Sequence, residues 1–210
     1  MVSQVEKWAE AAKIGYYSLN IIDPPDGTIW GKFNDRPLKE QQVEDLVDDF
    51  KGRLMNSSMK HAMYLAVKRE WIENITEKEV NPVGEPIENL PLIKFTPEAL
   101  KEIKQRQAMW MMSGNHRRRA LEIHVKKMRD KLEAVRERKI KMHSKQREDG
   151  FTSTANAIET QADAEIVQRE QGIEMTMRWI VLVYDQSAWQ CLSYSEGAPV
   201  ASALSSVILC

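Results

Sequence analysis

The chain has 210 residues, of which 42% are hydrophobic and 29% are charged, and its formal net charge at pH 7 is −1. This length and composition are those of a soluble, globular protein with one well-buried core and an appendage, or with at most two small domains. Only two cysteines occur, Cys191 and Cys210, and they support neither a disulfide framework nor a zinc site.

The amino-terminal sequence, MVSQVEKWAEAAK, lacks the long apolar stretch of a secretory signal. No run elsewhere approaches the roughly 18 apolar residues of a membrane span. We therefore expect an intracellular protein, cytoplasmic or nuclear, that does not enter a membrane.

The first half of the chain predicts two helices and two strands. A short helix is expected over residues 5–13, and a strand rich in aromatic and β-branched residues over 16–22, ended by the DPPDG loop at 23–27. A second strand is expected over 61–68. The helix between them, about 38–51, follows from apolar residues at i, i+3, i+4 and i+7, which are Val43, Leu46, Val47 and Phe50.

After an acidic, proline-containing loop over about 73–92, the chain returns to regular elements. Thr96-Pro97-Glu98 provides a cap and a proline at the first helical position, which predicts a helix to about Gln107. A strand over 109–112 follows directly. The apolar run RWIVLVY at 178–184 is the strongest strand signal in the chain. The sequence thus predicts an α+β fold, a small mixed sheet flanked by helices.

Between the last two strands, the sequence predicts a helical hairpin over about 122–175. Its first helix has an apolar stripe at 4-3-4-3 spacing in which Lys139 fills one slot; the apolar members are Leu121, Val125, Met128, Leu132, Val135 and Met142. Asp149-Gly150 interrupts it, and a more acidic helix is expected near 155–171. The stripe packs against this second helix or, alternatively, forms a homodimer.

The first hairpin helix is strongly basic. Residues 117–147 hold thirteen Lys or Arg against four acidic residues, so the rest of the chain carries the compensating negative charge. This asymmetry indicates an acidic partner, either another molecule such as a nucleic acid or an acidic neighbour within the chain.

Residues 109–121, MWMMSGNHRRRAL, form the most distinctive stretch. The apolar run stops at Ser113-Gly114, and a cluster of basic residues then begins a helix. Cations at this end of a helix are unfavourable because it is the positive pole of the helix dipole. An anion among them would remove that cost, so the pattern predicts an anion site; an ordinary solvated face is the alternative.

This stretch resembles the ParB/sulfiredoxin superfamily. SGNHRRRAL is similar to a Gly-x-His-Arg or Gly-x-x-Arg signature whose turn holds nucleotide phosphates, and NDRPLKEQQVEDLVDDF is similar to the Arg-Pro-Leu element and helix of sulfiredoxins. The order of YSLNII, HAMYLAVK, WMMSG and RWIVLVYD also matches. The resemblance implies a ParB/sulfiredoxin-like domain over 1–190, with its core at about 16–121 and 178–185, the hairpin at about 122–175 as an insertion, and a tail at 191–210 of no assigned role.

Two departures limit what the resemblance implies. Sulfiredoxins carry a nucleophilic cysteine directly before the His-Arg pair, and here that position is Asn115, so sulfiredoxin activity is not implied. Their phosphate-contacting Lys, Ser and Thr fall on Gln42, Asp45 and Asp49. Carboxylates near phosphates repel them unless a hard cation such as Mg²⁺ lies between.

Similarity to ParB proteins also stops at the motif. Their Gly-Glu-Arg-Arg-x-Arg-Ala sequence at the CTP site is similar to residues 114–120, but no helix-turn-helix domain follows, so centromere binding is not implied. Kinases and nucleases of this superfamily require an acidic residue. Asp23, Asp26 and Asp35 are candidates, and the sequence does not choose among them.

We therefore expect a nucleotide, ATP or CTP with or without Mg²⁺, or another phosphate ligand at the turn. The residues assigned to it are Ser113, Gly114, Asn115, His116, Arg117 and Arg36. Alternatively, His116 hydrogen-bonds its own turn and Arg36 braces its loop. Three functions follow: nucleotide binding with or without kinase or phosphohydrolase activity, nucleic-acid binding through the basic helix, or a protein-interaction scaffold.

Overall fold

The computed structural model describes residues 4–31, 37–75, 83–149 and 153–188. Its core is a five-stranded mixed sheet with the order β1-β5-β3-β4-β2. The strands are β1 (Lys13–Asn20), β2 (Thr28–Trp30), β3 (Met63–Val67), β4 (Met109–Met111) and β5 (Arg178–Asp185). β5 pairs antiparallel with β1 and parallel with β3, while β4 pairs antiparallel with β3 and parallel with β2. The predicted α+β class and all four predicted strands are confirmed.

The sheet is covered on both faces, which explains why β5, an interior strand, is continuously apolar. Trp179 to Leu182 of β5 are buried between β1 and β3. Successive side chains of a strand point to opposite faces. In β3, Met63 and Leu65 accordingly join the main core, whereas Ala66 packs on the other side with Met112 and with Ala12, the last residue of α1 (Gln4–Ala12).

The helices over the main core have the predicted apolar faces. α2 (Glu40–Gly52) buries Val43, Val47 and Phe50. In α3 (Pro97–Arg106), the Thr96 side chain accepts a hydrogen bond from the Ala99 N–H at 3.1 Å, as the capping pattern predicts. Short 3-10 helices lie in the loops at Met59–His61, Arg69–Trp71 and Ile87–Asn89.

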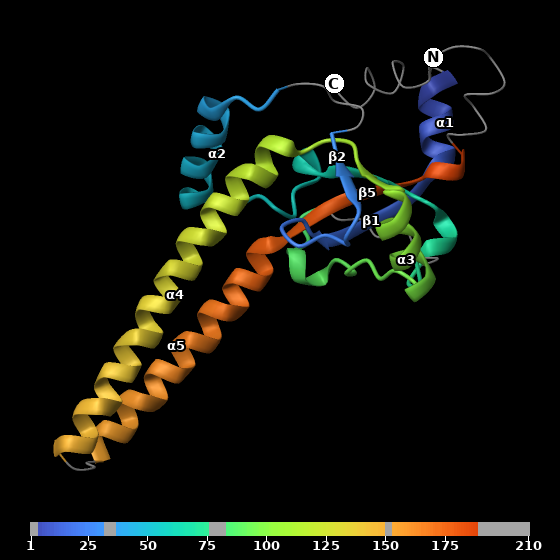
Figure 1. The fold of residues 1–210 in the computed structure, drawn as a ribbon. Coiled ribbons are helices and arrows are strands. Elements are labelled where there is room, and N and C mark those ends of the chain that lie inside the picture. The colour runs from blue at the N-terminus through green and yellow to red at the C-terminus, as the bar shows by residue number, and fades with distance from the viewer. Residues whose placement is uncertain (1–3, 32–36, 76–82, 150–152, 189–210) are drawn as a thin grey trace.

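Two long antiparallel helices, α4 (Asn115–Asp149) and α5 (Ser153–Met177), form a hairpin that projects from the sheet (Figure 1). α4 leads away from the sheet, and α5 returns beside it. Of the apolar stripe on α4, Leu121, Val125, Leu132 and Val135 are buried. Lys139, which fills the polar slot of the stripe, forms an ion pair with Asp163 of α5. The stripe therefore packs within the hairpin, and a homodimer through the hairpin stays a prediction.

The hairpin is anchored in the core at its base. Val125, Leu132 and Ile173 belong to the same buried cluster as the strands, and α2 packs beside the first turns of α4 (Figure 1). α4 also begins earlier, and α5 ends later, than the predicted hairpin bounds of about 122 and 175. The treatment of the hairpin as an insertion into a ParB/sulfiredoxin-like domain stays a prediction.

One strand was not predicted. β2 has three residues and pairs with β4 through Thr28–Met109, Ile29–Trp110 and Trp30–Met111. Arg36, Asp35 and the tail at 191–210 lie outside the described residues. In the described part of the chain, no helix is long and apolar enough to span a bilayer.

Candidate functional site

The predicted site lies where β4 turns into α4. Gly114 has φ +100°, and a Cβ atom at this position would lie 2.6 Å from the Met63 sulfur. The Ser113 hydroxyl accepts a hydrogen bond from the Tyr64 N–H at 3.3 Å. Both residues therefore fix the turn against β3. α4 begins at Asn115, and its first internal bond runs from the Arg118 N–H to the Gly114 carbonyl at 2.8 Å.

His116 connects this turn to the start of α2. Its Nε2 atom accepts a hydrogen bond from the Lys39 backbone N–H at 3.0 Å, which requires a ring nitrogen without a proton. A cavity of about 350 Å³ lies here, lined by Pro37, Lys39, Gln42 and His116. His116 therefore bonds to α2, not to its own turn, and still lines a cavity.

Arg117 lies on the inner side of α4. Its guanidinium is partly buried, with Nη1 3.4 Å from the His61 carbonyl and Nη2 3.5 Å from His61 Nδ1. Burial lowers the pKa of Arg117, and an electrostatic interaction with Tyr64 acts in the opposite direction but more weakly. An arginine nevertheless remains charged at neutral pH. Among the described residues, no carboxylate lies within ion-pair distance of it. This partly buried cation therefore has no ion-pair partner in the part of the chain that the structure describes.

Arg117 lines a second cavity, of about 280 Å³, between α2 and the sheet. Its wall is mostly apolar but contains three charged or titratable groups besides Arg117. The lining residues are Leu46, Asp49, Phe50, Arg53, Met55, His61, Arg117 and Trp179. The Trp179 indole donates to the His61 carbonyl at 2.8 Å, and its ring lies 5.9 Å from that of Phe50.

His61 is held in its neutral form. Burial lowers its pKa, and the positive charges of Arg117 and Lys60 lower it further. Because an ordinary histidine titrates near pH 6.5, a lowered pKa leaves this imidazole uncharged at neutral pH. His61 therefore offers hydrogen bonds in the cavity but no charge.

The next two arginines have other partners. The Arg118 guanidinium lies 4.7 Å from the centre of the Trp30 ring and pairs with Glu122 at 3.1 Å. Arg119 pairs with the same carboxylate at 3.2 Å. This agrees with the expectation that the three arginines point to different faces of the helix.

Other predicted residues fall in different places. Gln42 and Asp49 line the two cavities, but Asp45 accepts a hydrogen bond from the Gln41 side chain at 3.0 Å. Asp26 pairs with Lys104 of α3 at 3.0 Å, and Asp23 lies 3.9 Å from Arg129. No group of three or more His, Cys, Asp or Glu residues suited to a metal ion occurs within the described ranges.

The sequence did not indicate Lys39, Arg53, His61 or Trp179 as part of the site. These residues come from three separate segments, and only the pairing of β3 with β5 and the packing of α2 on α4 bring them together. Trp179 lies in the apolar run of β5, and its position there predicted only that its side chain would belong to the hydrophobic core.

Comparisons of the chain with known protein families, with characterised proteins and with solved structures give no match.

Proposed function

We propose that this protein binds a phosphate-bearing ligand in the two cavities between α2 and the first turn of α4. A nucleoside triphosphate such as ATP or CTP, with or without Mg²⁺, is the candidate that suits the site best. The proposal includes the ParB/sulfiredoxin-like relationship, which the mixed sheet and the glycine turn before α4 support.

The observation that carries the proposal is the partly buried Arg117 without a carboxylate partner among the described residues. Removing a guanidinium from water costs free energy unless an anion and hydrogen bonds compensate it. The contacts to His61 are long, at 3.4 and 3.5 Å, and therefore compensate it only weakly. A phosphate oxygen in this cavity would supply the missing charge and a strong hydrogen bond.

The start of α4 adds further donors. The first N–H groups of a helix have no partner within the helix, and together with the helix dipole they favour an anion. His116 stands beside them, and Lys39 lines the same cavity. A phosphate chain extending from Arg117 toward Lys39 would meet positive charge at both cavities.

The rest of the second cavity suits the less polar part of a nucleotide. Leu46, Phe50, Met55 and Trp179 give it an apolar wall, as most small-molecule sites have. Asp49 would repel a phosphate directly but would hold one through Mg²⁺, whose preferred ligands are carboxylate and phosphate oxygens.

A thermal unfolding screen tests this function. We expect one of ATP, CTP, GTP or their diphosphates to raise Tm, because a ligand at about 100 times its Kd stabilises the folded state by roughly 2.7 kcal/mol. For a chain of this size, that corresponds to a shift of about 5 to 10 °C. Each nucleotide is measured with and without Mg²⁺, and inorganic triphosphate shows how much of the shift the phosphates alone produce. If none of these compounds shifts Tm, the proposed function is wrong.

A further inference from the structure

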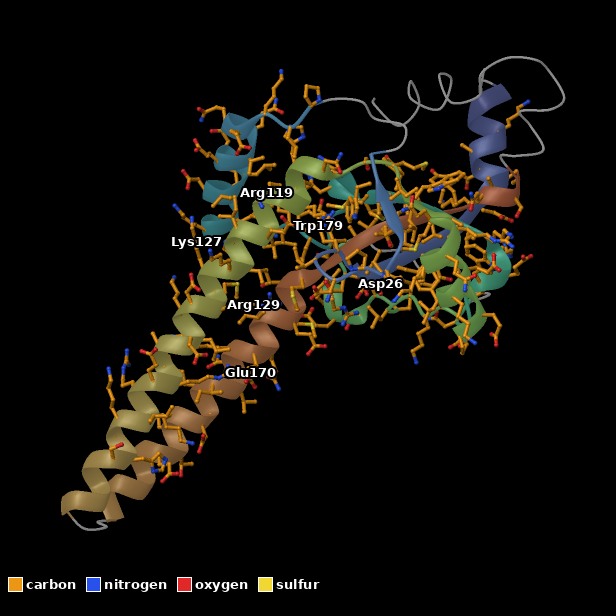
Figure 2. All side chains as sticks on the ribbon, viewed as in Figure 1. Asp26, Arg119, Lys127, Arg129, Glu170 and Trp179 are labelled. Atoms are coloured by element: carbon orange, nitrogen blue, oxygen red, sulfur yellow. The ribbon has the colours of Figure 1, made fainter. Side chains whose placement is uncertain are left out.

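Beyond its first turns, α4 carries two sets of cations with different surroundings. One group is paired with acidic residues: Arg129 lies 3.9 Å from Asp23, Arg136 pairs with Glu170 at 2.6 Å, and Lys139 pairs with Asp163. Figure 2 shows Arg129 and Glu170 on the side where α4 and α5 meet. Arg136 and Lys139 thus pair with acidic residues of α5, and Arg129 lies near an acidic residue of the loop that follows β1.

A second group, which we call the basic row, consists of Lys131, Arg138 and Lys141. All three are exposed, and none has a carboxylate within ion-pair distance among the described residues. At about 100° per residue, the three side chains lie within an arc of roughly 80°. Lys127 continues the row toward α2, where Lys51 lowers the pKa of Asp48 through a hydrogen bond and its charge, and the charge of Lys127 adds a smaller contribution. The Lys127 side chain points away from α5 (Figure 2).

We infer that the basic row binds the phosphate backbone of duplex DNA. From Lys131 to Lys141 the row is about 15 Å long at 1.5 Å per residue, and Lys127 extends this line of positive charge to about 21 Å. A duplex presents one negative charge per roughly 1.7 Å of its axis, so several phosphates lie within this length. Helix α4, which carries the row, is straight and projects from the sheet together with α5 (Figure 1).

The composition of this face favours DNA over a protein partner. Between the cations, the face presents only Ala134, which is exposed, while Leu132 and Val135 are buried within the hairpin. Stable protein interfaces need an apolar or aromatic centre, which this face lacks. A polyanion needs none, because the release of condensed counterions drives its binding, and this release is greater for duplex DNA than for a single strand. Asp130 and Glu137 border the row, and because their carboxylates repel phosphates, they lower its affinity for DNA.

Fluorescence anisotropy with a 30-base-pair duplex of mixed sequence tests the inference. The row variant is Lys131→Gln/Arg138→Gln/Lys141→Gln, and the matched control is Arg129→Gln/Arg136→Gln/Lys139→Gln, which removes the same charge from the paired group. For the row variant, we expect affinity at low salt to fall about tenfold or more, and the slope of log K against log[salt] to become shallower by about 2 to 3. We expect the control to retain the wild-type slope and to bind within about threefold of wild type, since its cations are already neutralised.

Three results would overturn the inference: no binding of wild type to the duplex, an equal loss in both variants, or equally tight binding of poly-glutamate, which would indicate an acidic protein as the partner. Circular dichroism of both variants checks that α4 and α5 remain helical. This inference is independent of the nucleotide site, because none of the six substituted residues lines either cavity.

Discussion

Replacing Gly27 with alanine is expected to lower the free energy of unfolding by about 3 kcal/mol or more. A Cβ atom at this position would lie 2.2 Å from the Ile103 carbonyl oxygen and 2.8 Å from the Lys104 Cα, both of which belong to the backbone of α3. The residue also has φ +89°, where an L side chain is strained. Because helix backbone cannot rotate away as a side chain can, α3 or the 23–27 loop would have to shift.

Urea denaturation measures this effect, with Gly172→Ala as the control. Gly172 lies inside α5, and a Cβ atom there would have nothing within 4 Å, so alanine should leave stability unchanged or raise it by up to about 1 kcal/mol. A loss below about 1 kcal/mol for Gly27→Ala would show that the loop does not pack on α3 as described.

Replacing Gly114 with alanine is expected to cost about 2 to 4 kcal/mol, from strain at φ +100° and from contact with Met63. The new Cβ would lie 2.6 Å from the sulfur and 2.9 Å from the terminal methyl carbon of Met63, a side chain that is fully buried. Unlike the backbone beside Gly27, this neighbour can be truncated, so the two contributions can be separated.

A double-mutant cycle with Met63→Ala separates them. Met63→Ala alone should cost about 2 to 5 kcal/mol because it leaves a cavity. We expect the double variant to be more stable than the sum of the two single effects by about 0.5 to 3 kcal/mol, since the clash is absent once Met63 is truncated. Strict additivity would contradict the close packing of the glycine turn on β3.

Elements whose signal lies within a few neighbouring residues could be predicted from the sequence. The apolar run of β5, the cap at Thr96 and the face of α2 each depend on neighbouring residues, and each is found where the sequence places it. β2 could not be predicted, since Thr28–Trp30 is too short to show an alternating pattern and becomes a strand through its parallel pairing with β4. Lys139 occupies a position in the apolar stripe because it forms an ion pair with Asp163 of α5. The sequence of α4 alone could not show this partner.

For the candidate site as well, the local motif could be predicted from the sequence, but the contacts between distant segments could not. The SGNHRRRAL motif predicted a glycine turn at the start of a helix, and the different faces of Arg117, Arg118 and Arg119 follow from helix geometry. Nothing in the sequence indicated that the Ser113 hydroxyl bonds to the Tyr64 N–H, or that Arg117 lies beside His61. Both contacts join residues about fifty positions apart, and no local pattern encodes them.

The most direct test of the phosphate site is isothermal titration calorimetry with the nucleotide that raises Tm most, using wild type, Arg117→Ala and Arg119→Ala. A hydrogen bond to a charged group contributes roughly 1.5 to 3 kcal/mol, so we expect Arg117→Ala to weaken binding by about tenfold to a hundredfold. Arg119 pairs with Glu122 and its side chain is 52% exposed, so we expect its removal to change affinity by less than about threefold. An absence of binding heat with wild type, or an equal loss of affinity in both variants, would contradict a phosphate site at Arg117.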